Sequence, residues 1–271
     1  MKKVILLSAA AALALSCSQH KDPKILVLYY SQNGSTKAVA EEICNSLGAD
    51  IEAIVPVTPF DGSFQETIER CLKDREAGIL PDIQPLASDI KEYDVIFLGY
   101  PVWFGTFAPP VSSILDNVDF SGKKIVPFCT FGSGGLDSST KDLKEKLPDA
   151  EVLPGYGVRA ARIDAAPAEV DRFLKENGFI KGEYVKLEEF PAPHPVSEED
   201  VSIFDAAVGD YPMIHAAAEE VASRNVPGGI EYLFTARDIP RDGNQAVSPG
   251  TIKVYVLAEE GQVPVFTQVI R

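Results

Sequence analysis

Three apolar runs in the first half of the chain each end in a turn rich in glycine and hydroxyl side chains, and a helix-forming pattern follows each turn. The runs are Lys24 to Tyr30, Asp94 to Leu98 and Lys124 to Thr130. Continuous apolar runs bounded by turn residues are typical of strands buried on both faces, as in a parallel sheet. Because a helix follows each strand, the pattern predicts βαβ units and an α/β fold.

Further segments complete this alternation of strands and helices. Two more strands are expected near Ile51 to Val55 and Glu151 to Val158. Helices are expected near Ser35 to Leu47, Phe64 to Ala77, Phe107 to Asn117, Ser139 to Lys146 and Ala168 to Asn177. The first part of the chain is therefore predicted to be a doubly wound α/β domain with a five-stranded parallel sheet.

The turn after the first strand has the composition of a phosphate-binding loop. It consists of Ser31, Gln32, Asn33, Gly34, Ser35 and Thr36. Their hydroxyls, amides and backbone N–H groups precede a helix, whose positive dipole end suits a phosphate monoester and thus a nucleotide. The turn lacks the three glycines of a dinucleotide fingerprint and the Gly-Lys-Ser/Thr of a triphosphate loop. Taken alone, it also fits an ordinary strand-to-helix turn with a Ser/Thr cap.

The only tryptophan of the chain follows the strand that ends at Leu98. It belongs to a predicted binding loop made of Pro101, Val102, Trp103, Phe104 and Gly105. In doubly wound folds the loops at the carboxyl ends of central strands bind ligands, and an aromatic ring there stacks on a flat heterocycle. Aromatic residues also belong in cores, but a turn with Pro and Gly is a poor place for core packing. We therefore expect Trp103 to be a ring platform.

The turn after the third buried strand is rich in glycine. It contains Thr130, Phe131, Gly132, Ser133 and Gly134. Glycines let the backbone approach a planar ligand closely. A single turn of this kind is weak evidence, whereas three such turns in order, each at a strand end, favour one shared binding site.

In this order the three turns resemble those of the flavodoxin family. In that family the Ser/Thr-rich turn holds the phosphate of flavin mononucleotide (FMN), the Tyr-Pro-Val-Trp loop supports the isoalloxazine ring, and the third turn covers the pyrimidine side with backbone donors. The resemblance covers residues 24–181 and is to the short-chain form, because no long loop interrupts the fifth strand. It implies an electron carrier that uses FMN, with the peptide between Phe104 and Gly105 as a hydrogen-bonding candidate.

Two other functions stay open at this point. The first is an NAD(P)H-dependent quinone or flavin reductase on the same fold, although no dinucleotide site is evident in the sequence. The second is a non-redox binding module that uses the C-terminal part of the chain. An electron carrier is the preferred function, with no catalytic acid or base, so whether the chain is a self-contained enzyme stays open.

The amino terminus reads as a secretory signal over residues 1–16. Lys2 and Lys3 precede a short apolar run, and Ala14-Leu15-Ser16-Cys17 resembles a bacterial lipobox. This resemblance implies that Cys17 becomes the lipid-modified first residue of a cell-envelope lipoprotein, periplasmic or anchored in the outer membrane. Cleavage without lipidation is the alternative.

The other cysteines and the charge exclude several classes of function. Cys44, Cys71 and Cys129 have no Cys-x-x-Cys spacing and stand in apolar contexts, so we expect core residues and no metal site. The formal charge is −15, or −17 without Lys2 and Lys3. This acidity disfavours nucleic acid and anionic membrane surfaces, and it is compatible with unidentified redox partner proteins that carry positive charge.

A second unit is expected after the flavodoxin-like domain, which we place at residues 17–187. A proline-rich linker at residues 188–200 precedes an α+β domain at residues 201–271. In that domain helix is expected over Val201 to Ser223, followed by strands at Ile230 to Ala236, Thr251 to Val256 and Val263 to Ile270. The order of these elements resembles a cystatin-like layout, and their role cannot be inferred from the fold alone.

Overall fold

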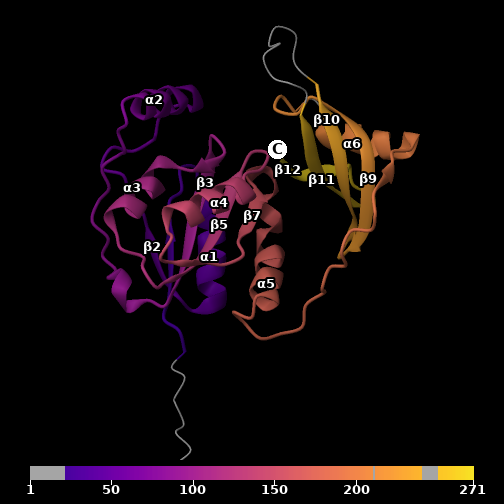
Figure 1. Cartoon of the computed structure of the whole chain (residues 1–271). Helices are drawn as coiled ribbons and strands as arrows, with labels where there is room; N and C mark the ends of the chain where they lie inside the picture. Colours follow the sequence, from indigo (N-terminus) through magenta and orange to yellow (C-terminus); the bar gives the residue numbers. More distant parts are fainter. Residues whose placement is uncertain (1–21, 210, 240–249) are drawn as a thin grey trace, which may run out of the picture.

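The computed structural model describes residues 22–209, 211–239 and 250–271, which form two domains joined by an extended segment (Figure 1). The predicted signal peptide and Cys17 lie outside the described residues. In the part of the chain that is described, no helix is both long enough and apolar enough to cross a bilayer.

The first domain is an α/β domain built around one sheet. Its strands are β1 (Ile25–Tyr29), β2 (Asp50–Ala53), β3 (Val95–Trp103), β4 (Thr106–Phe107), β5 (Lys124–Phe131), β6 (Glu151–Val152) and β7 (Tyr156–Arg159). Its α-helices are α1 (Ser35–Leu47), α2 (Phe64–Glu76), α3 (Pro109–Asn117), α4 (Leu136–Lys146) and α5 (Ala166–Glu176), with short 3₁₀ turns at Ile90–Glu92 and Ala160–Ala165.

The strand order confirms the predicted doubly wound topology. The parallel strands run in the order β2-β1-β3-β5, and both β6 and β7 pair with β5. These two short strands are the predicted fifth strand, divided between Val152 and Tyr156. The division lies beside Pro127 of β5, which has no N–H to donate to a neighbouring strand. A proline in a central strand is therefore accommodated by a local break in its partner.

Helices cover both faces of this sheet, and the core lies between them and the strands. On one face, α1 and α5 pack against the sheet through side chains such as Ile43 and Leu174. On the other face, α3 and α4 pack through side chains such as Ile114 and Leu143. Apolar residues therefore alternate between two separate cores along β1, where Leu26 and Val27 face opposite sides.

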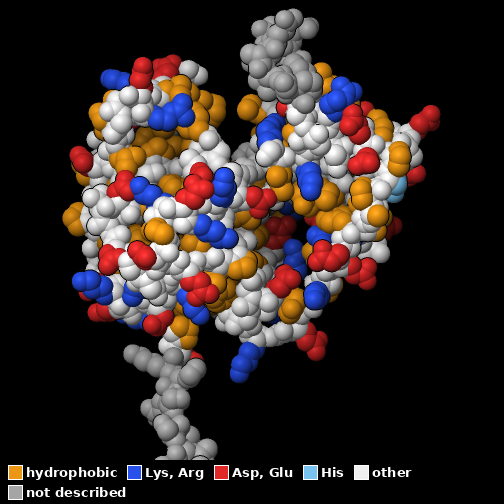
Figure 2. Space-filling model, in the orientation of Figure 1, with side chains coloured by type: hydrophobic (Ala, Val, Ile, Leu, Met, Phe, Trp, Pro, Cys, Tyr) orange, Lys and Arg blue, Asp and Glu red, His pale blue; other side chains and the backbone are white. Residues whose placement is uncertain are grey.

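Helix α2 is set apart from these layers, beyond the carboxyl ends of the strands (Figure 1). Only Thr67 and Cys71 of this helix are buried, while the Phe64 side chain is 81% exposed. Its start is stabilised by a capping box between Ser63 and Glu66. Figure 2 shows hydrophobic side chains gathered around this part of the molecule. The segment between β2 and β3 therefore borders the edge at which the predicted binding loops lie.

The second domain is an antiparallel sheet with one helix packed on it, as predicted for an α+β unit. It contains β8 (His194–Pro195), α6 (Glu198–Val208), β9 (Ala216–Val226), β10 (Gly229–Asp238), β11 (Thr251–Glu259) and β12 (Val265–Ile270). The strand order is β12-β11-β10-β9-β8, and Phe204 of α6 packs on Phe234 with ring centroids 5.1 Å apart. The cystatin-like resemblance stays a prediction.

Two features of this domain differ from the sequence-based expectation. Residues 216–223 form strand β9 instead of helix, although the run Ala-Ala-Ala-Glu-Glu favours a helix. Pairing of β9 with β10 along its whole length, and burial of Val221 under α6, outweigh that local preference. The stretch predicted as a linker contains β8, which pairs with β9, and the start of α6.

Candidate functional site

The three predicted loops meet at the carboxyl ends of β1, β3 and β5, which are adjacent strands. The first and third loops are joined by a hydrogen bond of 2.8 Å between the hydroxyls of Thr36 and Thr130. The second loop is joined to α4, the helix that follows the third loop, because the Ser138 hydroxyl donates to the carbonyl of Gly105 at 2.5 Å. The fold therefore brings the predicted site residues together at one edge of the sheet.

The first loop leaves the start of α1 without a side-chain cap. Gly34 occupies the N-cap position with φ +94° and has no side chain to cap the helix. The starts of α3, α4 and α5 also have no side-chain cap, whereas Ser63 and Ser197 cap α2 and α6. The Gly34 N–H donates to the Ser31 hydroxyl at 3.1 Å, and the Ser35 N–H to the Asn33 side chain at 3.3 Å. Both distances exceed the usual 2.9–3.0 Å. An exposed, weakly bonded helix start of this kind suits an anion.

Gln32 differs from its neighbours in this loop. Its side-chain amide donates to the carbonyl of Phe60 at 3.0 Å and to the hydroxyl of Thr67 at 3.1 Å. The side chain therefore connects the loop to the segment that contains α2. Any contact of this residue with a ligand would compete with these two bonds.

Trp103 lies at the end of β3 in a cluster of three aromatic rings. Its ring centroid is 5.9 Å from that of Tyr30 and 5.3 Å from that of Phe60, both in edge-to-face geometry. The guanidinium of Arg70 lies over the Phe60 ring, 3.8 Å from its centroid. Trp103 itself is only partly buried. It is thus held in place by Tyr30 and Phe60 while part of its surface stays accessible.

The segment after Trp103 is a tight hairpin and not the irregular loop that was expected. Strand β3 continues to Trp103 and pairs antiparallel with β4, so Phe104 and Gly105 alone form the turn. Their φ angles are +52° and +83°, as a two-residue hairpin requires. Phe104 is the only non-glycine residue with positive φ among the described residues. The peptide between Phe104 and Gly105 is therefore backbone-strained and exposed.

Several predicted site residues direct their side chains into the protein. Thr36, Thr130 and Phe131 are each no more than 3% exposed. The two threonines bond to each other, and Phe131 packs in the core beneath α4. Pro101 and Val102 are partly buried in β3. These residues shape the site mainly through the backbone and through loop-to-loop contacts.

The third loop is contacted by Arg159 of β7 and by strand β12 of the C-terminal domain. The carbonyl of Gly132 accepts a bond of 2.9 Å from Arg159 Nε, and the carbonyl of Ser133 accepts one of 2.7 Å from the backbone N–H of Val269. Gly134 lies so close to β12 that an added Cβ would be 2.0 Å from the carbonyl oxygen of Val269. Neither Arg159 nor β12 was predicted to belong to the site, and no pattern in the sequence links them to this loop.

Burial raises the pKa of two side chains near the loops, those of Tyr30 and Cys129. Burial raises the pKa of Tyr30 to about 12, so its hydroxyl stays protonated. Burial also raises the pKa of the Cys129 thiol, which is fully buried beside the third loop. Lys37 in the first turn of α1 lies 3.6 Å from Glu41 and is exposed. Among the described residues no cluster of His, Cys, Asp and Glu has the arrangement of a metal site.

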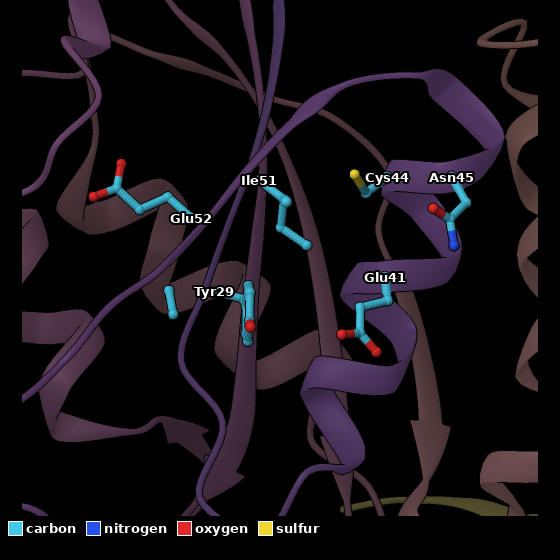
Figure 3. A pocket seen from close by; sticks show the side chains of 7 residues that line it. Tyr29, Glu41, Cys44, Asn45, Ile51 and Glu52 are labelled. Atoms are coloured by element: carbon cyan, nitrogen blue, oxygen red, sulfur yellow. The ribbon is translucent and has the colours of Figure 1, made fainter.

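A pocket of about 360 Å³ lies elsewhere, between α1 and β2 (Figure 3). It is lined by Tyr29, Glu41, Cys44, Asn45, Ile51, Glu52 and Ala53. Two of its polar groups are engaged, since the Glu52 carboxylate accepts the N–H groups of Ala87 and Ser88 and the Cys44 thiol donates to the Ala49 carbonyl. None of the predicted site residues lines this pocket, so it is separate from the three loops.

The fold and the three loops define a doubly wound α/β protein with a nucleotide-type site at the carboxyl edge of its sheet. Comparison with known families matches residues 24–167 to flavodoxin. The chain belongs to the flavodoxin family, whose cofactor is FMN. The match ends before the C-terminal sheet, which the family does not account for.

Three individual proteins are similar to this chain. A flavodoxin-like domain-containing protein, BilS, of Clostridioides difficile (strain CD3) is 26% identical over 193 residues, covering 68% of this chain and 93% of the relative. A candidate flavoprotein from Bacteroides uniformis ATCC 8492 has 22% identity and a TM-score of 0.50, covering 56% and 99% of the two chains. A flavoprotein from Lactobacillus acidophilus NCFM, solved in complex with FMN, has 26% identity and a TM-score of 0.47, covering 55% and 97%.

Proposed function

We propose that this protein binds FMN at the three loops and transfers electrons through it. One observation carries the proposal: the start of α1, which has no side-chain cap, and Trp103 lie at the carboxyl ends of the adjacent strands β1 and β3. A nucleotide needs both an anion site for its phosphate and a flat surface for its ring. Membership of the flavodoxin family supports the same assignment.

The residues present fit an FMN phosphate without a basic side chain. The hydroxyls of Ser31 and Ser35, the amide of Asn33 and the N–H groups of Gly34 and Ser35 lie at the positive end of α1. The long bonds that now close this loop can be exchanged for bonds to phosphate oxygens, which are stronger because the acceptor is charged.

The ring of the cofactor would lie against Trp103, between the hairpin turn and the third loop. Tyr30 and Phe60 pack edge-to-face against the indole of Trp103, and Gly132 and Gly134 have no side chain that would keep a ligand from the backbone of the third loop. When bound, FMN supplies the transfer of one or two electrons. The chain binds and orients the cofactor, keeps water from its ring by apolar contact, and provides backbone groups near its edge.

A spectroscopic titration tests the proposal. The chain from Ser18 onward is purified and titrated with FMN, and the flavin spectrum is followed during stepwise chemical reduction and then with NADPH. Saturable binding, with reduction by the chemical reductant but not by NADPH, is the result expected for an electron carrier. Prompt reduction by NADPH indicates a quinone or flavin reductase instead. Absence of FMN binding contradicts the proposal and favours a binding module that uses the C-terminal domain.

We also infer that the protein works outside the cytoplasm as a lipoprotein anchored through Cys17, handing electrons to redox partner proteins. The lipobox-like sequence before Cys17 supports this inference. Lys24 enters β1 at the end of the sheet opposite to the three loops, so a membrane tether on this side would leave the loops facing away from the bilayer (Figure 1). Cys17→Ala is expected to abolish lipid labelling and release the protein, and persistence of the label contradicts the anchor.

A further inference from the structure

We propose that the C-terminal domain is part of the flavin site: β12 and Arg159 fix the loop from Gly132 to Gly135, so that FMN binding and docking of the domain strengthen each other. This inference rests on the proposed function, since it requires that FMN binds at this loop. It assigns a role to the domain that lies beyond the flavodoxin match and names Arg159 as a positioning residue.

Arg159 joins the two domains through contacts of its whole guanidinium group. It stands at the end of β7 and is 9% exposed. Its Nε donates to the Gly132 carbonyl at 2.9 Å, and a terminal nitrogen donates to the Phe266 carbonyl of β12 at 2.7 Å. The guanidinium carbon also lies 3.4 Å from the Phe266 ring centroid. The Tyr211 ring lies on the guanidinium as well, 5.4 Å from its carbon, and within the described residues no carboxylate pairs with Arg159, so two carbonyls and two rings are its partners.

Strand β12 adds a contact that is made by the backbone alone. It is the edge strand of the C-terminal sheet, and Figure 1 shows it at the domain boundary next to β7. Its Val269 N–H donates to the Ser133 carbonyl at 2.7 Å, so part of the unpaired edge is satisfied by the third loop. Gly134 has no room for a Cβ against Val269. The loop therefore fits β12 only with glycine at this position.

The coupling follows from the flexibility of this loop. Three glycines in four residues, 132–135, give a chain that loses much conformational entropy when it is ordered. A docked C-terminal domain holds the loop in one conformation, so a ligand that needs that conformation binds with less ordering cost. Linkage is reciprocal, hence a bound ligand stabilises the docked arrangement by the same factor.

Hydrogen exchange of the full chain from Ser18 onward tests the coupling without any substitution. Peptides covering β12 are followed by mass spectrometry with and without saturating FMN. We expect FMN to slow exchange of these peptides by roughly tenfold, within the range typical of coupled sites. Peptides of β9 and β10, which do not touch the loops, serve as the internal control. Exchange of β12 that is unchanged by FMN, while FMN demonstrably binds, overturns the proposal.

Variants of two arginines separate positioning of the loop from general stability. Arg159→Met is expected to weaken FMN binding about tenfold and to speed exchange of β12. Arg159→Lys keeps a donor and a positive charge, and an intermediate affinity is expected. Arg224→Met is the control, because Arg224 also contacts a ring, that of Phe190, and a backbone carbonyl, that of Glu188, but lies away from the loops. Arg224 additionally pairs with the Glu231 carboxylate at 2.7 Å, so its loss is expected to cost at least as much stability as the loss of Arg159. Equal effects of Arg159→Met and Arg224→Met on FMN affinity overturn the role of Arg159.

A glycine variant tests the fit of β12 itself in the absence of FMN. Gly134→Ala introduces a methyl group against the Val269 carbonyl, so exchange of β12 is expected to speed up. Gly250→Ala, where an added Cβ meets no atom within 4 Å, is the control. Unchanged exchange in Gly134→Ala contradicts the docked arrangement. Because this measurement needs no cofactor, failure of FMN to bind at all is recognised separately as failure of the proposed function.

Discussion

Thr36 and Thr130 share one buried hydrogen bond, and replacing them with valine tests whether that bond ties the first loop to the third. The two hydroxyl oxygens are 2.8 Å apart, and the residues are 1% and 3% exposed. Valine has nearly the same shape as threonine but cannot form the bond. Each single variant therefore leaves the other hydroxyl buried without its partner, which costs about 1–3 kcal/mol in free energy of unfolding.

The double variant is the informative one. With both hydroxyls gone, no buried polar group is left unpaired, so the loss is expected to stay below about 1.5 kcal/mol. The singles and the double are then non-additive, with an interaction energy of about 1–3 kcal/mol. If the tie is needed for cofactor binding, FMN binding is weakened in both single variants and stays weak in the double. If only an unpaired hydroxyl disturbs the loops, the double largely restores FMN binding. If the Thr36 hydroxyl itself contacts the phosphate, FMN affinity stays low in the double variant.

Urea unfolding followed by tryptophan fluorescence is the appropriate assay. Trp103 is the only tryptophan, and it lies beside the loops, so its signal reports the first domain without that of the second. Thr58→Val, at an exposed position of the first domain, is the control and is expected to change stability by less than about 0.5 kcal/mol. Additive losses in the double variant, or losses in the singles no larger than in the control, refute the reasoning.

Three further outcomes are expected. Trp103→Ala should weaken FMN binding by about 1–3 kcal/mol through lost aromatic contact. Flavin titration measures the affinity, with Phe190→Ala as the control, and an unchanged affinity of Trp103→Ala means that Trp103 is not part of the site. Phe104→Gly should raise the free energy of unfolding by about 0.5–1 kcal/mol because it relieves a positive φ, and a loss in urea unfolding contradicts the strain. Hydrogen bonds from the side chain and the backbone N–H of Ser63 lower the pKa of the Glu66 carboxyl, so the capping box should stabilise α2 above the ordinary glutamate pKa and weaken as the pH falls through the lowered value. Ser63→Ala removes the side-chain bond and keeps the backbone one, so the pKa measured by NMR should rise toward its ordinary range, and an unchanged pKa contradicts the role of the hydroxyl.

Most of the first domain could be predicted from the sequence, because its signals are local. Helix α1 spans the residues expected from its apolar stripe, and the buried strands are continuous apolar runs. That the three predicted loops meet at one edge of the sheet could be predicted because each follows the end of a parallel strand. The hairpin at Phe104 and Gly105 was not predicted, since a positive φ at phenylalanine runs against every local preference.

The features that escaped prediction depend on contacts between distant parts of the chain. Strand β9 has a helix-favouring composition, and only its pairing with β10 makes it a strand. The bond from Arg159 to Phe266 joins residues that are 107 positions apart. Nothing about an arginine at the end of a strand indicates which carbonyls it will meet. The direction of the Gln32 side chain toward Thr67 is likewise decided by where α2 packs.

The contact between the domains stabilises one element of each, the edge strand β12 and the glycine-rich third loop. An antiparallel sheet that ends in a full-length edge strand exposes unpaired backbone groups and invites association with other chains. At the opposite edge β8 pairs with only two residues of β9, so backbone groups are left unpaired at both edges, and at β12 the third loop takes up one of them. A glycine-rich loop, in turn, needs an external support if it is to hold one conformation. Docking β12 on this loop satisfies both requirements at once, and it explains why the contact is made by backbone groups and by one arginine that bonds only to carbonyls.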